Sequence, residues 1–210
     1  HSVTLLAIVA SSRATNFNFV SPDGKFIVTP SGSANTLLLI ETNTKAERSV
    51  QFGPRITLGY SSLHVLGYSD DGRTAFVERT TLFGPSDELF GIDLASGESN
   101  VIATASRGGW GFGAGSHSFG TFEVEMGAEK PVWVHTETIS HYPQRESQKY
   151  VRWTRNGRSF EKFIDTDGDT SIVNVLAHAD AVSIEPRNGK TKFYSLETGE
   201  EIERPKPAGL

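Results

Sequence analysis

Four short apolar runs separated by turn residues occupy residues 19–52, and this stretch constrains the fold more than any other. Residues 21–24 (SPDG) predict a tight turn, because proline presets φ and glycine accepts a positive φ. Residues 30–32 and 42–45 break the chain again, so the stretch predicts a four-stranded β-meander. A single meander of this size is too small to bury its own faces, and we therefore expect neighbours of the same kind.

The same turn sequence returns further along the chain. Residues 69–72 (SDDG) repeat residues 21–24 at a spacing of 48, the difference between Gly72 and Gly24. Two later units are more degenerate, although Asn156-Gly157 predicts a hairpin turn. A period of roughly 40–50 residues with four strands per unit is typical of β-propellers. We predict one all-β, propeller-like domain over residues 1–210, with four blades at about residues 13–52, 63–104, 116–164 and 170–204.

The two clearest units also resemble known repeats. Residues 20–47 are similar to the repeat of YVTN-type surface-layer and lactonase-like propellers, which runs SPDG, apolar strand, SGSNT, apolar strand and a D/E-T-x-T turn. Residues 68–98 resemble the related TolB-like repeat, with SDDGR and then an L/I-D-L-x-S-G-E run. The resemblance implies a propeller in an extracellular or periplasmic location. It is compatible with enzymes, docking platforms and cell-surface modules alike.

Members of these families commonly contain more than four blades. The chain is therefore expected to be either a small ring or part of a larger propeller, in which case other blades or other chains are its partners. The unit pattern alone does not decide between these two arrangements.

Charge and cysteine content exclude several classes of function. The formal net charge is −5, so the whole chain is not an electrostatic nucleic-acid binder. The absence of cysteine excludes disulfides, thiolate metal ligands and thiol nucleophiles. Residues 3–10 (VTLLAIVA) are far shorter than the ~20 residues that span a bilayer. We expect them to form a buried strand, with the end of a signal peptide as the alternative.

Polar side chains on one predicted strand are the first candidate site. His135, Glu137 and His141 share a face, because side chains alternate along a strand. Two imidazoles and a carboxylate indicate a divalent-metal site or an acid/base pair. His135 and His141 could share one ion only if the chain folded back, since six residues of strand span ~20 Å. Solvated polar residues are the alternative; as an enzyme, the chain would use His117, His135, Glu137 and Arg152 in catalysis.

A glycine-rich segment is the second candidate. Residues 106–120 (SRGGWGFGAGSHSFG) would let the backbone approach a ligand closely, and Trp110 could stack on a sugar ring. A long connection between blades is the alternative.

A basic and aromatic run is the third candidate. Residues 142–162 carry six basic and two acidic side chains, a local charge of +4. We expect this run and the glycine-rich segment to form one surface, on which Trp153 and His141 contact the ligand. Arg152 and Arg155 would attract an anionic glycan or an acidic protein partner. Alternating charges on a solvated strand are the alternative.

Three alternate carboxylates form the fourth candidate. Asp165, Asp167 and Asp169 present several oxygens in a tight loop, as Ca²⁺ requires. A turn that aspartate caps without metal is the alternative.

Two functional classes follow from these patterns. The first is a non-catalytic binding or scaffold module that recognises a protein or a glycan. The second is a lactonase-like or polysaccharide-lyase-like enzyme acting on a carbohydrate or lactone. We favour the first, because the sequence shows no nucleophile elbow, paired-carboxylate motif or complete set of metal ligands. Convergence of the His, Glu and Arg candidates on one channel would favour an enzyme, and scattering would favour a scaffold.

Overall fold

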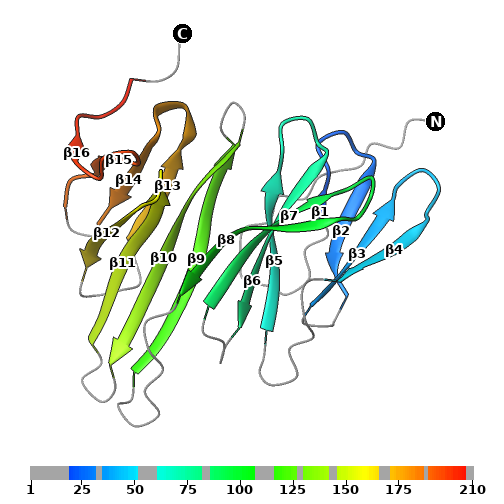
Figure 1. Cartoon of the computed structure of the whole chain (residues 1–210), viewed down its shortest axis with the longest axis horizontal. Helices are drawn as coiled ribbons and strands as arrows, with labels where there is room; N and C mark the ends of the chain where they lie inside the picture. The colour runs from blue at the N-terminus through cyan, green and yellow to red at the C-terminus, as the bar shows by residue number, and fades with distance from the viewer. Residues whose placement is uncertain are drawn as a thin grey trace.

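The computed structural model describes residues 19–31, 35–51, 61–81, 86–106, 116–126, 130–141, 146–165, 171–186 and 189–206. Within these ranges the chain forms four four-stranded antiparallel sheets, each a meander of consecutive strands (Figure 1). The predicted all-β, propeller-like architecture is confirmed. The first sheet contains β1 (Phe19–Val20), β2 (Phe26–Pro30), β3 (Thr36–Glu41) and β4 (Glu47–Gln51), and the second contains β5 (Ser61–Tyr68), β6 (Thr74–Thr81), β7 (Ser86–Asp93) and β8 (Ser99–Ser106).

The third and fourth sheets follow the same plan with different strand lengths. The strands of the third sheet are the longest, and a single 3₁₀ turn, η1 (Ala177–Ala179), interrupts the fourth. No helix among the described residues is long and apolar enough to cross a membrane. The third sheet contains β9 (Ser116–Met126), β10 (Pro131–His141), β11 (Glu146–Arg155) and β12 (Arg158–Asp165), and the fourth contains β13 (Ile172–Leu176), β14 (Ala181–Glu185), β15 (Lys192–Ser195) and β16 (Glu201–Ile202).

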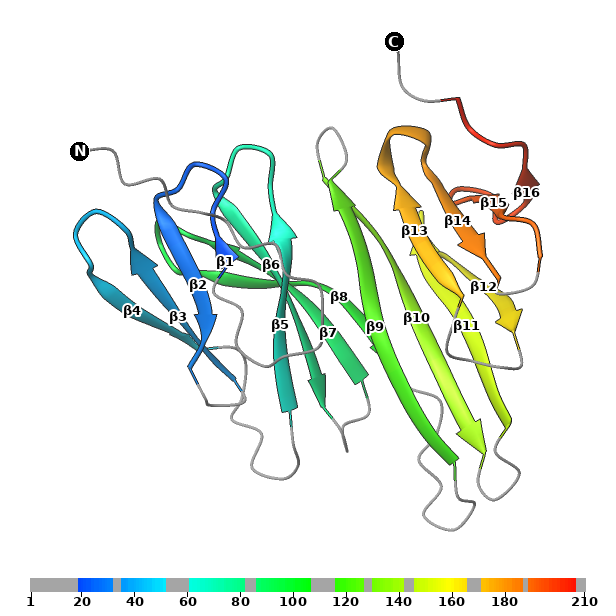
Figure 2. The ribbon, with the colours of Figure 1, turned by 180° about the vertical axis from the view of Figure 1, so that it is seen from behind.

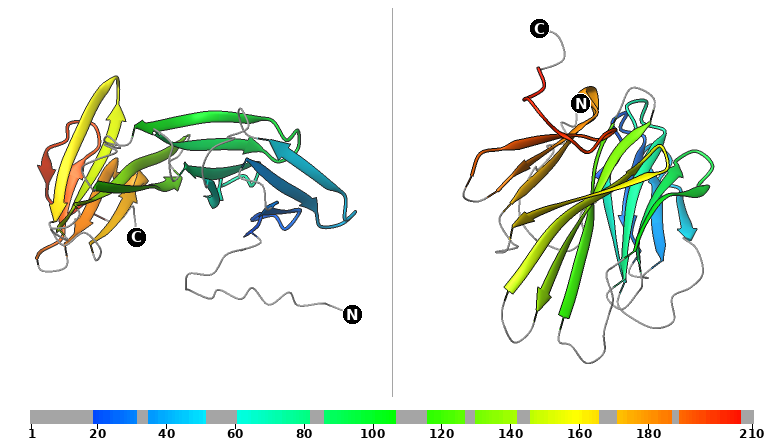
Figure 3. Two further views of the ribbon diagram at one scale, coloured as in Figure 1. Left: turned by 90° about the horizontal axis from the view of Figure 1, so that it is seen from below. Right: turned by 60° about the vertical axis from the view of Figure 1, so that its left-hand side comes forward.

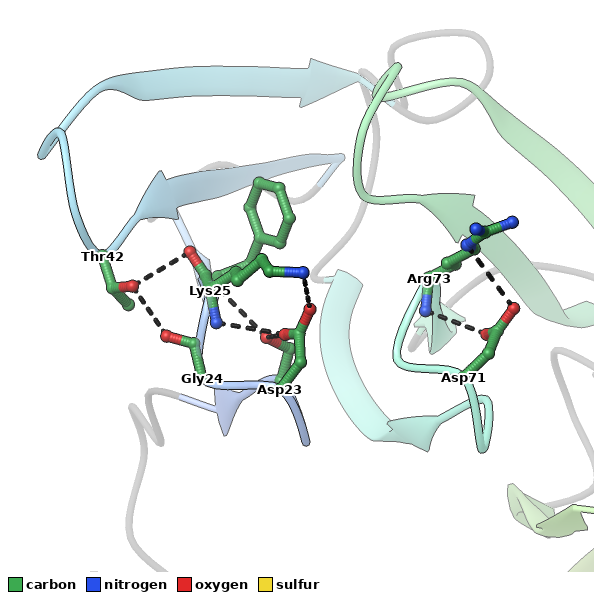
Figure 4. Close-up of polar contacts among 8 residues, drawn as sticks. Asp23, Gly24, Lys25, Thr42, Asp71 and Arg73 are labelled. Carbon is green, nitrogen blue, oxygen red and sulfur yellow. Dashed lines mark hydrogen bonds and ion pairs between the residues drawn. The ribbon is translucent and has the colours of Figure 1, made fainter.

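Two turns with the same chemistry introduce β2 and β6. In each, a serine hydroxyl donates to the aspartate two residues later, at 2.7 Å for Ser21 and 2.6 Å for Ser69. The glycine that follows has a positive φ, +71° at Gly24 and +68° at Gly72, which favours glycine at this position. Figure 4 shows both turns with their aspartates and the basic residues that follow. The prediction that these turns are equivalent in successive sheets is confirmed.

Apolar contacts join each sheet to the next. One core cluster lies between the first and second sheets and contains Leu37 and Val77, both fully buried. A second joins the second and third sheets through Leu89 and Phe122, and a third joins the third and fourth sheets. Burying one such side chain stabilises the fold by about 1.5–3 kcal/mol. The sheets are therefore held face to face in chain order.

The four sheets follow one another along an arc. The first and fourth sheets lie at its opposite ends when the molecule is seen from behind (Figure 2) and from below (Figure 3, left). None of the core clusters among the described residues joins these two sheets. The described part of the chain is thus an open arc of four propeller blades.

β9 overlaps the glycine-rich segment. This strand begins at Ser116, where the third blade was expected to begin, so the last five residues of the segment 106–120 belong to the strand. Residues 116–120 pair with residues 137–141 of β10, so backbone hydrogen bonding to a long partner strand extends the sheet. Residues 107–115, the remainder of that segment, lie outside the described residues together with Trp110.

Candidate functional site

A groove of about 360 Å³ opens between the second and third sheets. It runs from β8 across to β10, β11 and β12, and its volume lies within the ~300–1,000 Å³ range of ligand pockets. Several lining residues, among them Thr104, Thr154 and Ser159, are exposed, so the groove is reached from solvent. Its lining includes Thr104, Trp133, His135, Arg152, Ser159 and Glu161.

Strand register places three polar residues in one row across the third sheet. His135 on β10 pairs with Arg152 on β11, which in turn pairs with Glu161 on β12. Glu137 lies on the same face as His135, because side chains alternate along β10. Three of the four predicted catalytic residues, His135, Glu137 and Arg152, are therefore brought together.

Arg152 interacts with two carboxylates. Its Nε donates to Oε2 of Glu161 at 2.6 Å, and its Nη1 donates to Oε2 of Glu137. Its guanidinium also lies over the Tyr150 ring, 5.3 Å from the ring centroid. The Arg152 side chain is 30% exposed, Glu161 is 54% exposed, and Glu137 is fully buried. The positive charge at the groove is therefore already balanced by the protein.

A buried hydrogen bond between a histidine and a carboxylate links the second sheet to the third at the wall of the groove. Nε2 of His135 lies 3.1 Å from Oδ2 of Asp87, which stands on β7. A carboxylate only accepts hydrogen bonds, so Nε2 is the nitrogen that donates. Nδ1 of His135 is buried and has no hydrogen-bond partner among the residues that the structure describes. The pair connects residues 48 positions apart and ties two sheets together.

Gly120 on β9 provides the space for this pair. A Cβ at position 120 would lie 2.5 Å from Oδ2 of Asp87 and 2.6 Å from Cε1 of His135. Both distances are well inside van der Waals contact, so any side chain at Gly120 would displace the pair. A second polar link lies nearby, where Glu78 of β6 accepts the backbone N–H of Phe122 at 2.8 Å.

The basic run is divided between the two faces of the third sheet. Arg152 faces the second sheet, whereas Arg155 faces the fourth and donates to Asp180 at 2.7 Å. Lys149 donates to the carbonyl of Ser171 at 2.8 Å. The expectation that Arg152 and Arg155 form one anion-attracting surface is wrong, because residues three apart on a strand point to opposite faces.

Trp153 lies between the third and fourth sheets. It is 3% exposed, stacks on Phe160 at a centroid distance of 5.3 Å, and donates its indole N–H to the carbonyl of Leu196 at 2.7 Å. Its aromatic ring therefore packs in the core, although Trp153 also contributes to the lining of the groove, as does the half-buried Trp133.

Burial also shifts the pKa of a carboxyl group on β9, an edge strand of the third sheet. Glu123 on β9 is half-buried, and desolvation raises its pKa, while the charge of Lys149 acts in the opposite direction. Removal from water disfavours the charged form of a carboxyl group. Glu123 does not line the groove, so we assign this pKa shift no role in ligand binding.

The backbones of the other two candidate histidines, His117 and His141, lie further along the strands from His135, Glu137 and Arg152. On β9, His117 pairs with Ser140, five residues beyond His135 along β10. His141 ends β10, which is unbroken from Pro131 to His141. The separation of His135 and His141 is therefore ~20 Å, so they do not share a metal ion. The side chains of His117 and His141 lie outside the described residues.

The predicted calcium loop lies almost wholly outside the described residues. Asp165 ends β12, and its backbone pairs with Lys149. Asp167 and Asp169 are not described, so calcium binding at this loop stays a prediction. Among the residues that the structure does describe, no group of three or more His, Asp or Glu side chains could hold a metal ion.

Sequence reasoning missed Asp87 and Gly120. Asp87 precedes Leu89 by two positions on β7 and so shares its buried face. That alternation was a usable signal for a buried carboxylate. Its pairing with His135 had no local signal, because it joins two different repeats.

No family model and no curated protein matches the chain. Three solved structures are similar to it. They are the WD40 domain of SCAP from fission yeast (12% identity, TM-score 0.44), a putative 6-phosphogluconolactonase from Bacteroides uniformis (15%, 0.41) and oligogalacturonate lyase from Vibrio parahaemolyticus (10%, 0.35). The alignments cover 91%, 88% and 91% of this chain and 42%, 52% and 66% of those chains, respectively. The chain thus spans less than two thirds of each of them, and these similarities concern the fold alone.

Proposed function

We propose that the chain is a non-catalytic binding propeller whose ligand lies in the groove between the second and third sheets. One observation carries this proposal: the groove is open to solvent, but the acid/base groups at its wall and behind it are buried. His135 is 1% exposed, and Asp87 and Glu137 are fully buried. A general acid or base must reach the atom whose proton it transfers. The His135–Asp87 hydrogen bond therefore links the two sheets, Glu137 binds Arg152 within the third sheet, and the exposed lining is left for binding.

The lining favours a neutral glycan as the ligand. Thr104 and Ser159 offer hydroxyl groups, and the exposed Glu161 carboxylate accepts hydrogen bonds from sugar hydroxyls. Trp133 provides an aromatic surface for a sugar ring. An anionic glycan fits less well, because Arg152 is already paired with two carboxylates. A protein segment is the alternative ligand, and binding of peptides in place of oligosaccharides would identify it.

The repeat resemblance agrees with this proposal. Residues 20–47 and 68–98 resemble the YVTN-type and TolB-like repeats, and we propose that the chain is related to them and acts outside the cytoplasm. Many functions occur on such propellers, so the groove and not the repeat carries the functional argument.

The alternative is a propeller enzyme acting on a carbohydrate or lactone. The clustering of His135, Glu137 and Arg152 favours it, since convergence of these residues was the criterion for an enzyme. Their burial and their pairing with other protein groups weigh against it. His117, the fourth predicted member, has its backbone further along the sheet.

Filling the groove tests the proposal. Thr104→Trp places an indole in the groove without touching the buried pair, and Thr191→Trp, at another exposed threonine, is the matched control. Both variants and the parent would be titrated with neutral oligosaccharides, acidic oligosaccharides and immobilised peptides. We expect binding of a neutral oligosaccharide that Thr104→Trp weakens at least tenfold and Thr191→Trp leaves unchanged. Binding of peptides alone would assign a protein partner, and turnover of any oligosaccharide or lactone would contradict the non-catalytic function.

A further inference from the structure

The two end sheets of the arc each present an apolar outer face. On the first sheet, Val20, Ile27 and Ile40 form one row across β1, β2 and β3. Val20 is 43% exposed, and Ile27 and Ile40 are half-buried. A terminal repeat that faces solvent normally carries a polar outer face. The first sheet departs from that rule.

The repeat itself indicates what this face is built to contact. The 48-residue spacing of the turns makes Ile27 equivalent to Ala75 and Val28 equivalent to Phe76. Ala75 is fully buried against the first sheet, and Phe76 is buried against the third. Val28 is likewise buried against the second sheet, the next in order. By the same correspondence, Ile27 stands where a blade receives the blade that precedes it.

The fourth sheet ends the arc with the opposite face. Ser195 and Gly199 form the same turn as Asp93 and Gly97. The backbone nitrogen of the glycine lies 2.8 Å from the carbonyl oxygen of Ser195 in the first turn and 2.7 Å from that of Asp93 in the second. Leu196 and Leu94, equivalent in these turns, are both buried towards the preceding sheet. The outer face of the fourth sheet is the one that receives a following blade. Its apolar side chains are Ile172, 54% exposed, and the half-buried Leu176, Phe193 and Ile202.

We infer that a second copy of this chain docks on these faces and closes the arc into an eight-bladed ring. The three core clusters among the described residues each join a following face to a preceding face. Within the same part of the chain, the outer faces of the fourth and first sheets are one of each kind and have no neighbouring sheet. They lie at opposite ends of one molecule and do not meet within it (Figure 3, left). A two-fold axis places the outer face of the first sheet of one copy against the outer face of the fourth sheet of the other copy. The same contact therefore forms twice in the ring. Eight blades lie within the typical range of about 4–8.

The mass of the full chain in solution tests this inference. Analytical ultracentrifugation should show a species of 45.6 kDa, twice the 22.8 kDa of one chain. Ile27→Asp and Phe193→Asp each place a carboxylate in the new interface, and each should weaken the dimer at least tenfold. Val101→Asp, at a residue 55% exposed on β8 and away from both end faces, is the matched control and should leave the dimer unchanged.

A cross-link keeps the inference testable if either aspartate variant fails to fold. The chain has no cysteine, so the double variant Ile27→Cys with Phe193→Cys carries the only two thiols. Oxidation should yield a covalent dimer, which neither single variant should give in comparable amount. A parent protein that stays at 22.8 kDa at every concentration, open chains of more than two copies, or a dimer insensitive to both aspartates would overturn the inference. The result is independent of the proposed groove function, whose readout is ligand binding.

Discussion

Nε2 of His135 and Oδ2 of Asp87 lie 3.1 Å apart in a contact that joins two repeats. Both side chains are at most 1% exposed, so neither water nor a ligand can take the place of His135 or Asp87 in this hydrogen bond. A buried hydrogen bond of this kind makes a protein sensitive to the loss of one partner, because the remaining polar group is left without a partner in a dry site.

We first predict that Gly120→Ala destabilises the protein. The new Cβ would lie 2.5 Å from Oδ2 of Asp87, and overpacking of a buried site costs about 1–3 kcal/mol. Urea unfolding followed by far-UV circular dichroism measures the loss. Gly67→Ala is the matched control, since nothing lies within 4 Å of a Cβ at Gly67. Equal effects of the two substitutions would show that Gly120 has no special packing role.

The second prediction concerns energetic coupling across the two sheets. Asp87→Ala and His135→Ala should each lower the free energy of unfolding by at least about 1–3 kcal/mol, because each leaves a buried hydrogen-bonding partner unsatisfied. The double variant should cost less than the sum, with a coupling free energy of about 0.5–3 kcal/mol. A double-mutant cycle from urea unfolding measures this coupling. Additive losses would mean that the two side chains do not interact.

The third prediction is a pH effect at the first turn. The Ser21 hydroxyl, with the backbone N–H of Lys25, lowers the pKa of Asp23 from 3.8 to about 2. A carboxyl group with a lowered folded-state pKa stabilises the fold above pH 3.8, and that stabilisation is lost as the pH falls towards 2. Ser21→Ala should raise the pKa of Asp23, as measured by NMR titration of its carboxyl carbon. Ser49→Ala, at an exposed residue of the same sheet, should leave it unchanged.

The fourth prediction is that calcium binds the loop of Asp165, Asp167 and Asp169. An ion that binds the folded form raises its melting temperature. Saturating calcium should therefore raise Tm in the parent and leave it unchanged in Asp167→Ala. Asp70→Ala, at an exposed aspartate of another turn, is the control and should keep the calcium-dependent rise. The loop is an ordinary turn if calcium leaves the parent unaffected.

Local chemistry made most of the fold predictable from the sequence. The turns at Gly24 and Gly72 and the hairpin at Gly157 all have a positive φ, a backbone requirement that the sequence displays directly. The face of the sheet on which each side chain lies was harder to predict. Arg152 and Arg155 were expected on one surface, although their odd spacing along a strand already separates them.

The candidate site was only partly predictable for a related reason. His135 and Glu137 share a face through period-two alternation, which is visible in the sequence. Their partners Asp87 and Arg152 come from another repeat and another strand, and strand register sets those contacts. Burial then decides their role, and a single sequence does not show how deeply a polar residue is buried.

The meander topology also affects how the chain folds. Each sheet is made from one continuous segment, so most strand pairs are neighbours in the sequence and form without long loop closure. A sheet can therefore form before its neighbours, and docking of adjacent sheets is the slower, long-range event. Substitutions within one sheet should alter the folding of that sheet and its immediate neighbours, while the far end of the arc still assembles.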